Sequence, residues 1–326
     1  MKDLKKSQES LRIIATDKNP FAPGLFAADR HFLPPSITDI NYIEYLMALC
    51  ISEGVSAITT LIDPEIEILG RNRQKFIENG ILPLVPSEET AKACYDKFKM
   101  FEYLREHHIP TTLTYDSLPS FEEGLAAGEI SFPVFIKPRK GSGGMGAARI
   151  DDLKELKERL KNAHVEYIIQ EMMVGADLDV DVYVDCISGQ PVSMFSKRKI
   201  ESRIGGAIKT VSFKDKRLVE FVKRVLSKFE FYGPLDMDLF YINGQYYLSE
   251  INPRFGGAYP HAFGADVDFF RLIANNINGI ENAEELMNYE DDIMMMMYED
   301  FIIERKSDLK ESASELQESV FELELV

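Results

Sequence analysis

A predicted hairpin in the last third of the chain carries three oxygen-bearing side chains with the spacing of a metal site. The segments DMDLFY (236–241) and YYLSEINPRF (246–255) flank INGQ, a turn sequence that predicts two paired antiparallel strands. Glu250 and Asn252 are two residues apart and therefore point to the same face of their strand. A few hard oxygen ligands of this kind suit Mg²⁺ held jointly with substrate phosphates. The candidate ligands are Asp238, Glu250 and Asn252.

Positive side chains are placed where they can face these acids. Arg254 shares the face of Glu250, and basic residues also gather in KPRK (137–140) and SKRKIESR (196–203). Local positive charge in a chain of net charge −17 favours a small anionic ligand, whereas a nucleic acid would be repelled. The alternatives are a solvated basic face, or an ion-pair network in which Arg254 or Lys199 neutralises the acids without a metal.

A glycine-rich segment, KPRKGSGGMGAARI (137–150), contains the dinucleotide pattern G-x-G-x-x-G at Gly141, Gly143 and Gly146. A dinucleotide site needs a strand, a glycine turn and then a helix whose N-terminus faces the pyrophosphate. Here a short strand, AARI, follows the glycines, and no Lys-Ser/Thr pair follows them as in a P-loop. The pattern therefore predicts a hairpin loop whose backbone N–H groups can fold over phosphates, with Lys137 at its base. A mobile surface loop is the alternative.

The first 93 residues alternate between short buried strands and helices, which predicts a parallel α/β sheet. The predicted strands are RIIATD (12–17), SAITTLID (56–63) and ILPLVPS (81–87). The predicted helices are 39–54 and 63–80, each ending at a glycine. Since the chain opens on the polar, helix-like MKDLKKSQES, the strand that usually begins such a unit is expected to be absent.

The elements beyond residue 90 must position the glycine loop and the acids. A helix is predicted from Ala91 to about His108, and another over 151–162. Strands are predicted at 131–138, 147–150 and 167–171. The alternating DLDVDVYVD (177–185), followed by the turn SGQP, predicts a half-buried hairpin. The chain after the metal hairpin is expected to be helical.

The composition is that of an ordinary globular protein, 45% hydrophobic and 28% charged, and 326 residues predict two or three domains. Cys50, Cys94 and Cys186 are too far apart for a disulfide framework or a zinc site, so buried thiols in a reducing cytoplasm are expected. No apolar run approaches the roughly 20 residues of a membrane span. The expected protein is cytoplasmic, without a membrane or nucleic-acid partner.

The chain resembles the ATP-grasp superfamily, and most closely its carbamoyl-phosphate synthase large-chain-like members, over about residues 10–275. The resemblance lies in four ordered segments: DK (96–97), FPVFIKPRKGSGGMG, IIQEMMVGADLDVDVYVD and GPLDMDLFYINGQYYLSEINPRFGG. It implies a Rossmann-like pre-ATP-grasp α/β domain, expected to lack its first strand, followed by a two-subdomain ATP-grasp fold. The implied parts are the pre-ATP-grasp domain (1–93), the ATP-grasp domain (94–290) with a lid at about 113–170 and a metal and ATP subdomain at about 171–290, and an acidic helical tail (291–326).

The resemblance also implies roles for individual residues. The two lysines at 97 and 137 would contact the ATP phosphates under the glycine loop, and Glu171 with the next two backbone groups would receive the adenine. Asp177 stands where the family usually has a glutamate for the ribose hydroxyls. The implied ATP-binding residues are Lys97, Lys137, Gly141, Ser142, Gly143, Gly144, Gly146, Glu171, Met172, Met173 and Asp177. The implied ligands of one or two Mg²⁺ ions, or of Mn²⁺, are Asp238, Glu250 and Asn252, and the implied catalytic cations are Lys199 and Arg254.

The implied activity is an ATP-dependent ligation. A carboxylate attacks the γ-phosphate, ADP is released, and the acyl phosphate is captured by an amine or ammonia. The expected partners are small-molecule carboxylate and amine substrates. Whether the chain forms a homodimer is left open by the sequence. Two other functions fit the same residues: an ATP-binding module without ligase activity, regulatory or degenerate, and a small-molecule phosphotransferase.

Two further features have alternative interpretations. The segment LIDPE (61–65) could meet a substrate, but Asp63 and Glu65 also suit a helix N-terminus, and this second interpretation is favoured. His261, just after the metal strand, could face a substrate, but a packing role is favoured.

Overall fold

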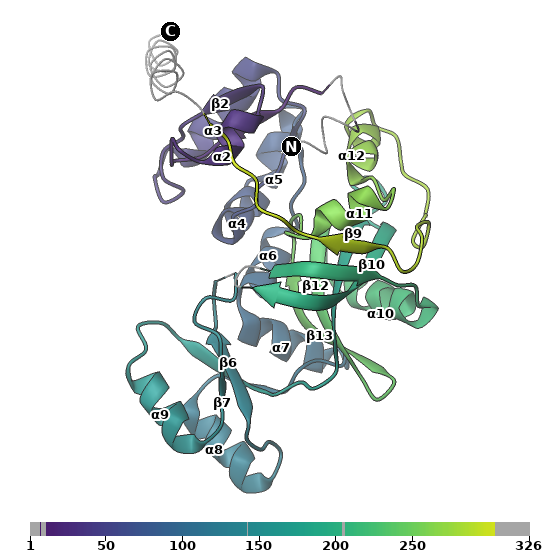
Figure 1. Cartoon of the computed structure of the whole chain (residues 1–326). Helices are drawn as coiled ribbons and strands as arrows, with labels where there is room; N and C mark the ends of the chain where they lie inside the picture. The colour runs from purple at the N-terminus through teal and green to yellow at the C-terminus, as the bar shows by residue number, and fades with distance from the viewer. Residues whose placement is uncertain (1–6, 8–10, 142, 204–205, 304–326) are drawn as a thin grey trace.

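The computed structural model describes residues 7, 11–141, 143–203 and 206–303. Figure 1 shows three parts along the molecule: an N-terminal unit of helices and short strands at the top, a twisted six-stranded sheet in the middle, and a four-stranded sheet with two helices at the bottom. No helix in these described ranges is long and apolar enough to cross a membrane. The mixed helix and sheet architecture expected from the sequence is confirmed.

The N-terminal unit is built from short strands and amphipathic helices around one core. Its elements are β1 (Ile14–Thr16), α2 (Pro23–Ala27), β2 (Arg30–Phe32), α3 (Tyr42–Glu53), β3 (Ala57–Ile58), α4 (Asp63–Arg71), α5 (Arg73–Glu78) and β4 (Leu82–Pro83). The strands pair in parallel, as predicted, but β1 pairs with the unpredicted β2, and β3 pairs with β4. The three predicted strands therefore do not share one sheet, because no ladder among the described residues joins the two pairs.

The helices expected over 63–80 and 91–108 are each interrupted. The first divides between α4 and α5, and the second divides at Asp96 into α6 (Glu88–Tyr95) and α7 (Lys97–Glu106). The Asp96 carboxylate accepts hydrogen bonds of 3.2 Å from two backbone N–H groups in the first turn of α7, as an N-cap does. Arg139, next to the glycine loop, donates to the same carboxylate at 2.8 Å. The helix α7 therefore begins at Lys97, next to the glycine loop.

The four-stranded antiparallel sheet and its two helices are here called the lid. Its elements are β5 (Thr114–Tyr115), α8 (Leu118–Ala127), β6 (Val134–Pro138), β7 (Ala148–Ile150), α9 (Leu153–Lys161) and β8 (Tyr167–Glu171), with strand order β5-β8-β6-β7. Phe121 and Leu156 of the two helices are fully buried against Ile136 of β6. Because side chains alternate along a strand, Lys137 points to the opposite face, away from this core.

The six-stranded sheet is antiparallel throughout its described pairs and has the order β13-β12-β9-β10-β11-β14. Its strands are β9 (Ala176–Val184), β10 (Pro191–Arg203), β11 (Gly206–Ser212), β12 (Gly233–Ile242), β13 (Gln245–Asn252) and β14 (Met294–Met296). One face packs its apolar side chains against α7 and α10 (Lys216–Leu226). On the other face, Tyr183 and Phe195 pack with α11 (Tyr259–Gly264) and α12 (Phe269–Ile277), and polar side chains occupy the rest.

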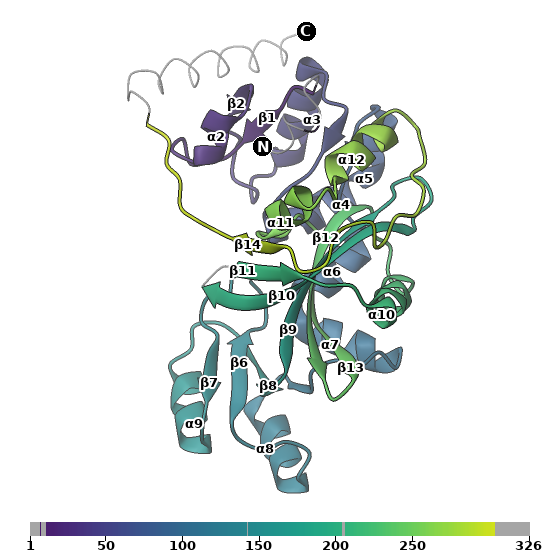
Figure 2. The ribbon, with the colours of Figure 1, turned by 45° about the vertical axis from the view of Figure 1, so that its right-hand side comes forward.

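Two expectations about this sheet are corrected. β9 is a central strand between β12 and β10, and residues 178–184 are buried on both faces rather than half-buried. Its alternation separates apolar side chains from buried acids. The helical tail expected from residue 291 is wrong over β14, which extends the sheet by pairing with β11 (Figure 2), and residues 304–326 lie outside the described residues.

Candidate functional site

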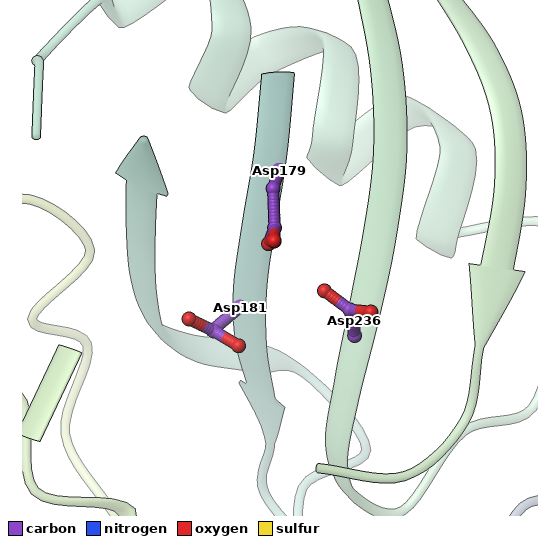
Figure 3. A group of neighbouring side chains, drawn as sticks. All are labelled: Asp179, Asp181 and Asp236. Atoms are coloured by element: carbon purple, nitrogen blue, oxygen red, sulfur yellow. The ribbon is translucent and has the colours of Figure 1, made fainter. Parts of the chain in front are cut away.

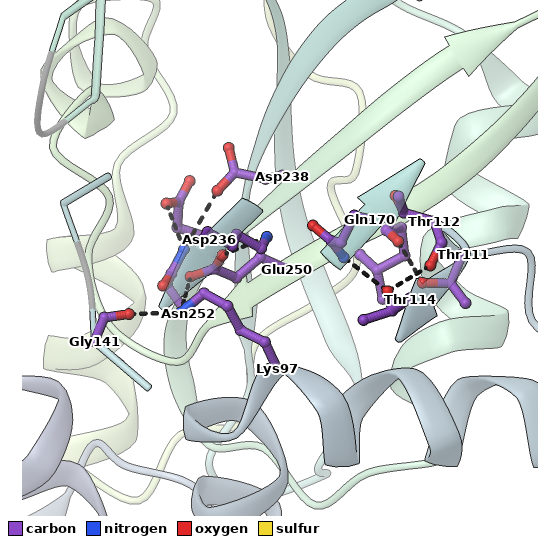
Figure 4. Close-up of polar contacts among 12 residues, drawn as sticks. Lys97, Thr111, Thr112, Thr114, Gly141, Gln170, Asp236, Asp238, Glu250 and Asn252 are labelled. Carbon is purple, nitrogen blue, oxygen red and sulfur yellow. Dashed lines mark hydrogen bonds and ion pairs between the residues drawn. The ribbon is translucent and has the colours of Figure 1, made fainter. Parts of the chain in front are cut away.

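The β12–β13 hairpin places the three predicted metal ligands side by side. The two turn residues, 243 and 244, have positive φ angles of 51° and 88°, which a tight two-residue turn requires. A register shift between Asp238 and Leu239 then places Asp238 opposite Glu250, and Asp236 lies opposite Asn252. Asn252 Nδ2 is 3.5 Å from an oxygen of Asp236 and 3.5 Å from one of Asp238 (Figure 4).

Two lysines from distant parts of the chain converge on Glu250. Lys137 of β6 places Nζ 3.3 Å from Glu250 Oε2, and Lys97 of α7 places Nζ 3.7 Å from Oε1. Lys97 also donates a 2.5 Å hydrogen bond to the carbonyl of Gly141 (Figure 4). Burial acts to raise the pKa of Glu250, but Lys137 and Lys97 outweigh burial and the pKa is lowered. The site therefore combines an ionised carboxylate with two ammonium groups beside the glycine loop.

Lys199 of β10 joins two further acids on the same face. Its Nζ lies 3.0 Å from Asp177 Oδ1 and forms an ion pair with Asp238. Burial acts to lower the pKa of Lys199, but Asp238 and Asp177 outweigh burial and raise it. A protonated Lys199 thus holds the predicted ribose-binding acid and a predicted metal ligand together.

Arg254 is bound by the N-terminal unit. Its Nε donates a 2.9 Å hydrogen bond to Asp63 Oδ1, at the first residue of α4. Glu65 instead turns inward and accepts hydrogen bonds from buried hydroxyl groups of Tyr42 and Thr60. Of the two acids in LIDPE, Asp63 is therefore the one that faces the site. It lines a pocket together with Ile66, Ala91, Cys94, Tyr95, Lys97, Gly141, Glu250, Ile251, Asn252 and Pro253.

The glycine loop connects β6 and β7, which pair antiparallel. This hairpin excludes the dinucleotide interpretation, since no helix follows the glycines directly. The φ angles at residues 141, 143, 144 and 146 lie between 66° and 117°, a range that glycine tolerates best. A Cβ at Gly146 would lie 2.8 Å from the Tyr167 hydroxyl, so the loop packs closely at that point. Ser142 lies outside the described residues.

The predicted adenine-binding segment lies between β8 of the lid and β9 of the central sheet. Glu171 ends β8, and its carboxylate accepts a 2.7 Å hydrogen bond from the backbone N–H of Leu113. The backbone N–H of Glu171 donates to the carbonyl of the same leucine at 3.0 Å. Met172 and Met173 follow and are half-buried. The Glu171 side chain therefore anchors the connection between the lid and the sheet.

A buried cluster that the sequence analysis did not single out continues the polar face. It consists of Asp179 and Asp181 of β9, Asp236 of β12 and Lys197 of β10, and Figure 3 shows the three acids on the two neighbouring strands. Lys197 Nζ lies 2.9 Å from Asp179 Oδ1 and forms an ion pair with Asp181. The signal was present as acids two residues apart in DLDVDVYVD and DMD, but the first segment was predicted only as a half-buried hairpin, and Asp236 was given no role.

His261 has the packing role favoured by the sequence analysis. It is 3% exposed, its Nδ1 lies 2.7 Å from Thr210 Oγ1, and its Nε2 lies 3.0 Å from the carbonyl of Ile293. Its ring also meets the edge of Phe195. Burial, together with Lys197, lowers the pKa of His261 to about 4.

The lowered pKa of His261 predicts a loss of stability in acid. The unfolded chain binds a proton near pH 6.5 and the folded protein only near pH 4, so stability falls as the pH drops through this window. Relative to a His261→Gln variant, the wild-type free energy of unfolding should fall by up to about 2–3 kcal/mol. Urea unfolding at a series of pH values measures this difference. The free energy of unfolding of a His164→Gln control, at an exposed histidine, should follow the wild-type dependence on pH. A His261→Gln curve parallel to the wild-type curve would contradict the prediction.

The three predicted ligands fit a hard divalent cation. Asp238 and Glu250 present carboxylates from paired strands, and Asn252 adds an amide oxygen. Both carboxylates also pair with lysines, so the ion-pair network that the sequence left as the alternative surrounds the same ligands.

Comparison with known proteins agrees with this geometry. A family model described as "ATP-grasp domain" matches residues 94–258, and one described as "PylC-like, N-terminal domain" matches residues 1–84. The formate-dependent phosphoribosylglycinamide formyltransferase of Prochlorococcus marinus (strain MIT 9301) is 22% identical over 284 residues, which cover 83% of this chain and 68% of that protein. The carbamoyl phosphate synthase large chain of Lachnoclostridium phytofermentans is 22% identical over 254 residues, which cover 69% of this chain and 22% of that protein.

Solved structures share the fold. N5-carboxyaminoimidazole synthetase from Staphylococcus aureus, complexed with ADP, superposes with a TM-score of 0.71 at 17% identity and covers 90% of this chain and 78% of that one. The biotin carboxylase domain of Hydrogenobacter thermophilus 2-oxoglutarate carboxylase, a dimer in complex with MgADP, ADP and bicarbonate, gives a TM-score of 0.70 at 17% identity, with 90% and 70% coverage.

Fold and site together define a protein in which a glycine-rich lid faces a sheet that bears paired acids and lysines. The chain belongs to the ATP-grasp domain family, whose model matches half of it, and the resemblance seen in the sequence is confirmed. It is an enzyme of the ATP-grasp ligase class, which forms carbon–nitrogen bonds with the use of ATP.

Proposed function

We propose that this protein joins a small-molecule carboxylate to an amine or ammonia through an acyl phosphate, in an Mg²⁺-dependent reaction that converts ATP to ADP and phosphate. The observation that supports this most directly is the convergence of Lys97 and Lys137 on Glu250 beside the glycine loop. Phosphoryl transfer depends on positioning and charge neutralisation more than on a covalent catalyst. These residues supply both.

The nucleotide would lie between the lid and the six-stranded sheet. Lys97 and Lys137 would face its phosphates, and the backbone of Met172 and Met173 would receive the adenine. Asp177 would bind the ribose, being 44% exposed and held by Lys199. In this proposal the lid spans about 113–170 and the metal and ATP subdomain about 171–290, after a pre-ATP-grasp domain that ends near residue 93.

The transferred phosphate would meet two cations already in place. Lys199 and Arg254 are paired with acids of the site, and so are oriented before a substrate arrives. Mg²⁺, held by Asp238, Glu250 and Asn252, would neutralise phosphate charge.

Cysteine thiolate catalysis has no support in this chain. Burial raises the pKa of Cys50 and of Cys186 to about 11, and burial also raises the pKa of Cys94. The three thiols therefore stay protonated near neutral pH, which leaves direct attack by the substrate carboxylate as the proposed first step.

A substrate screen tests the proposal. ADP and phosphate release would be measured for a panel of carboxylates, each with and without amines. Turnover that needs both substrates supports ligation. A stable phosphorylated product would replace the proposal with a phosphotransferase, and ATP binding without turnover on any substrate would replace it with a nucleotide-binding module.

Lys137→Met is expected to weaken ATP binding by about 10- to 100-fold, since a hydrogen bond to a charged group contributes about 1.5–3 kcal/mol. Methionine keeps an unbranched chain that is one heavy atom shorter, and it removes the charge. Fluorescent-nucleotide titration measures the affinity, with Lys154→Met at an exposed position of α9 as the control. Equal affinities for the two variants would remove Lys137 from the nucleotide site.

A further inference from the structure

The buried cluster of Asp179, Asp181, Asp236 and Lys197 has a charge that its own residues do not balance. The three carboxylates are at most 8% exposed, and their ligand oxygens lie within 4.8 Å of one another (Figure 3). With all three acids ionised, three carboxylates and one ammonium give a charge of −2 in a buried place. Such a charge is costly unless something neutralises it.

In the neighbouring part of the polar face, the negative and positive charges are equal in number. Asp177, Asp238 and Glu250 carry three negative charges, and their ion-pair partners Lys97, Lys137 and Lys199 carry three positive charges. The nearby Arg254 is likewise matched by Asp63. By this count of ionised groups, the excess of negative charge lies with the buried cluster.

Carboxylate oxygens in the cluster point at a shared space beside Gly256. Oδ1 of Asp181 and Oδ1 of Asp236 are buried and make no hydrogen bond to any described residue. A Cβ added to Gly256 would lie 2.9 Å from Asp236 Oδ1 and 3.1 Å from Asp181 Oδ1. The absence of a side chain at residue 256 thus leaves both oxygens facing the same region. Unsatisfied buried oxygens that converge in this way call for a ligand.

We propose that Asp179, Asp181 and Asp236 bind a hard divalent cation at a second site, separate from the ligands Asp238, Glu250 and Asn252. A divalent charge balances the cluster together with Lys197. Three carboxylate ligands suit Mg²⁺ or Mn²⁺, which prefer oxygen. The cation would link β9 and β12 beside the ATP-metal site.

The competing occupant is a proton. Burial and the neighbouring carboxylates raise the pKa of Asp236, so a protonated Asp236 would lower the charge without a metal. The two occupants can be distinguished by measurement. A cluster that takes a divalent cation binds Mn²⁺, and a cluster neutralised by a proton does not.

Mn²⁺ binding to the nucleotide-free full chain tests the site. Glu250→Gln removes a ligand of the ATP-metal site, so in this background the remaining site is measured alone by electron paramagnetic resonance of free Mn²⁺. We expect one Mn²⁺ per chain, displaced by Mg²⁺, and no such binding once Asp181→Asn is added. Asp177→Asn, on the same face of β9 but outside the cluster, should keep the bound ion.

Gly256→Ala provides a second variant that leaves every acid in place. Its methyl group would occupy the space that the two free oxygens face, and Mn²⁺ affinity in the Glu250→Gln background should fall about 10-fold or more. Circular dichroism verifies that each variant is folded. The proposal is overturned if Glu250→Gln binds no Mn²⁺, or if neither Asp181→Asn nor Gly256→Ala weakens binding. These outcomes involve no turnover, so they are independent of the proposed ligase activity.

Discussion

A Glu250→Gln variant is expected to lose ATP-dependent turnover while keeping the wild-type fold. Glutamine preserves the shape of the side chain but removes the charge that faces Lys97 and Lys137 and that would hold Mg²⁺. The rate should fall on the order of 1,000-fold, because a bound metal contributes several kcal/mol of charge stabilisation in the transition state. ADP release measured over a series of Mg²⁺ concentrations, once a turnover substrate is known, gives the result.

The fold of this variant should survive because Glu250 lies on the polar face of the sheet. The adjacent Ile251 points to the other face, into the core beneath α10. Glu284→Gln, at an exposed glutamate that pairs with Lys223, is the matched control and should retain wild-type rates. Wild-type turnover in Glu250→Gln would contradict the metal assignment, and loss of its circular dichroism spectrum would make Glu250 a structural residue.

Lys197→Met is expected to produce the largest loss of stability of any single change proposed here. Lys197 is fully buried and pairs with Asp179 and Asp181, and these acids raise its pKa against the effect of burial. Removing one partner of a buried ion pair leaves uncompensated charge and costs about 3–5 kcal/mol. Urea unfolding in the presence of EDTA, which removes any bound divalent cation, measures this loss.

Charge at the cluster, rather than lost packing, should account for most of this effect. Adding Asp181→Asn to Lys197→Met removes one of the stranded carboxylates and should recover part of the free energy of unfolding. Lys209→Met, which breaks an exposed pair with Glu201 on the neighbouring strand, should leave the free energy of unfolding nearly unchanged. If the double variant were less stable than Lys197→Met, the electrostatic explanation would fail.

Local patterns in the sequence were sufficient for the two hairpins that frame the site. The Asn-Gly turn predicts the pairing of β12 with β13. A register shift between Asp238 and Leu239, which the turn does not specify, is what places Asp238 opposite Glu250. The strand AARI after the glycines likewise shows that the glycine loop joins antiparallel strands. Both hairpins depend on turn chemistry and alternation within about 20 residues, so they can be read from the chain directly.

Burial and long-range pairing could not be read in the same way. The alternation in 177–185 is the same whether its acids face water or protein, and only the position of β9 at the centre of the sheet decides that they are buried. Parallel pairing of β1 with β2 likewise depends on contacts across a crossover, and neither strand specifies its partner.

The sequence by itself determined the family, the two hairpins and the residue types that face the proposed nucleotide. Only the tertiary structure decided which charges meet. It brought Lys97 and Lys137 from separate segments to Glu250, and Asp63 to Arg254. It also gathered the buried acids around Lys197. The reason is physical: the strength of a charge interaction depends on distance and burial, and both are set by packing between remote parts of the chain.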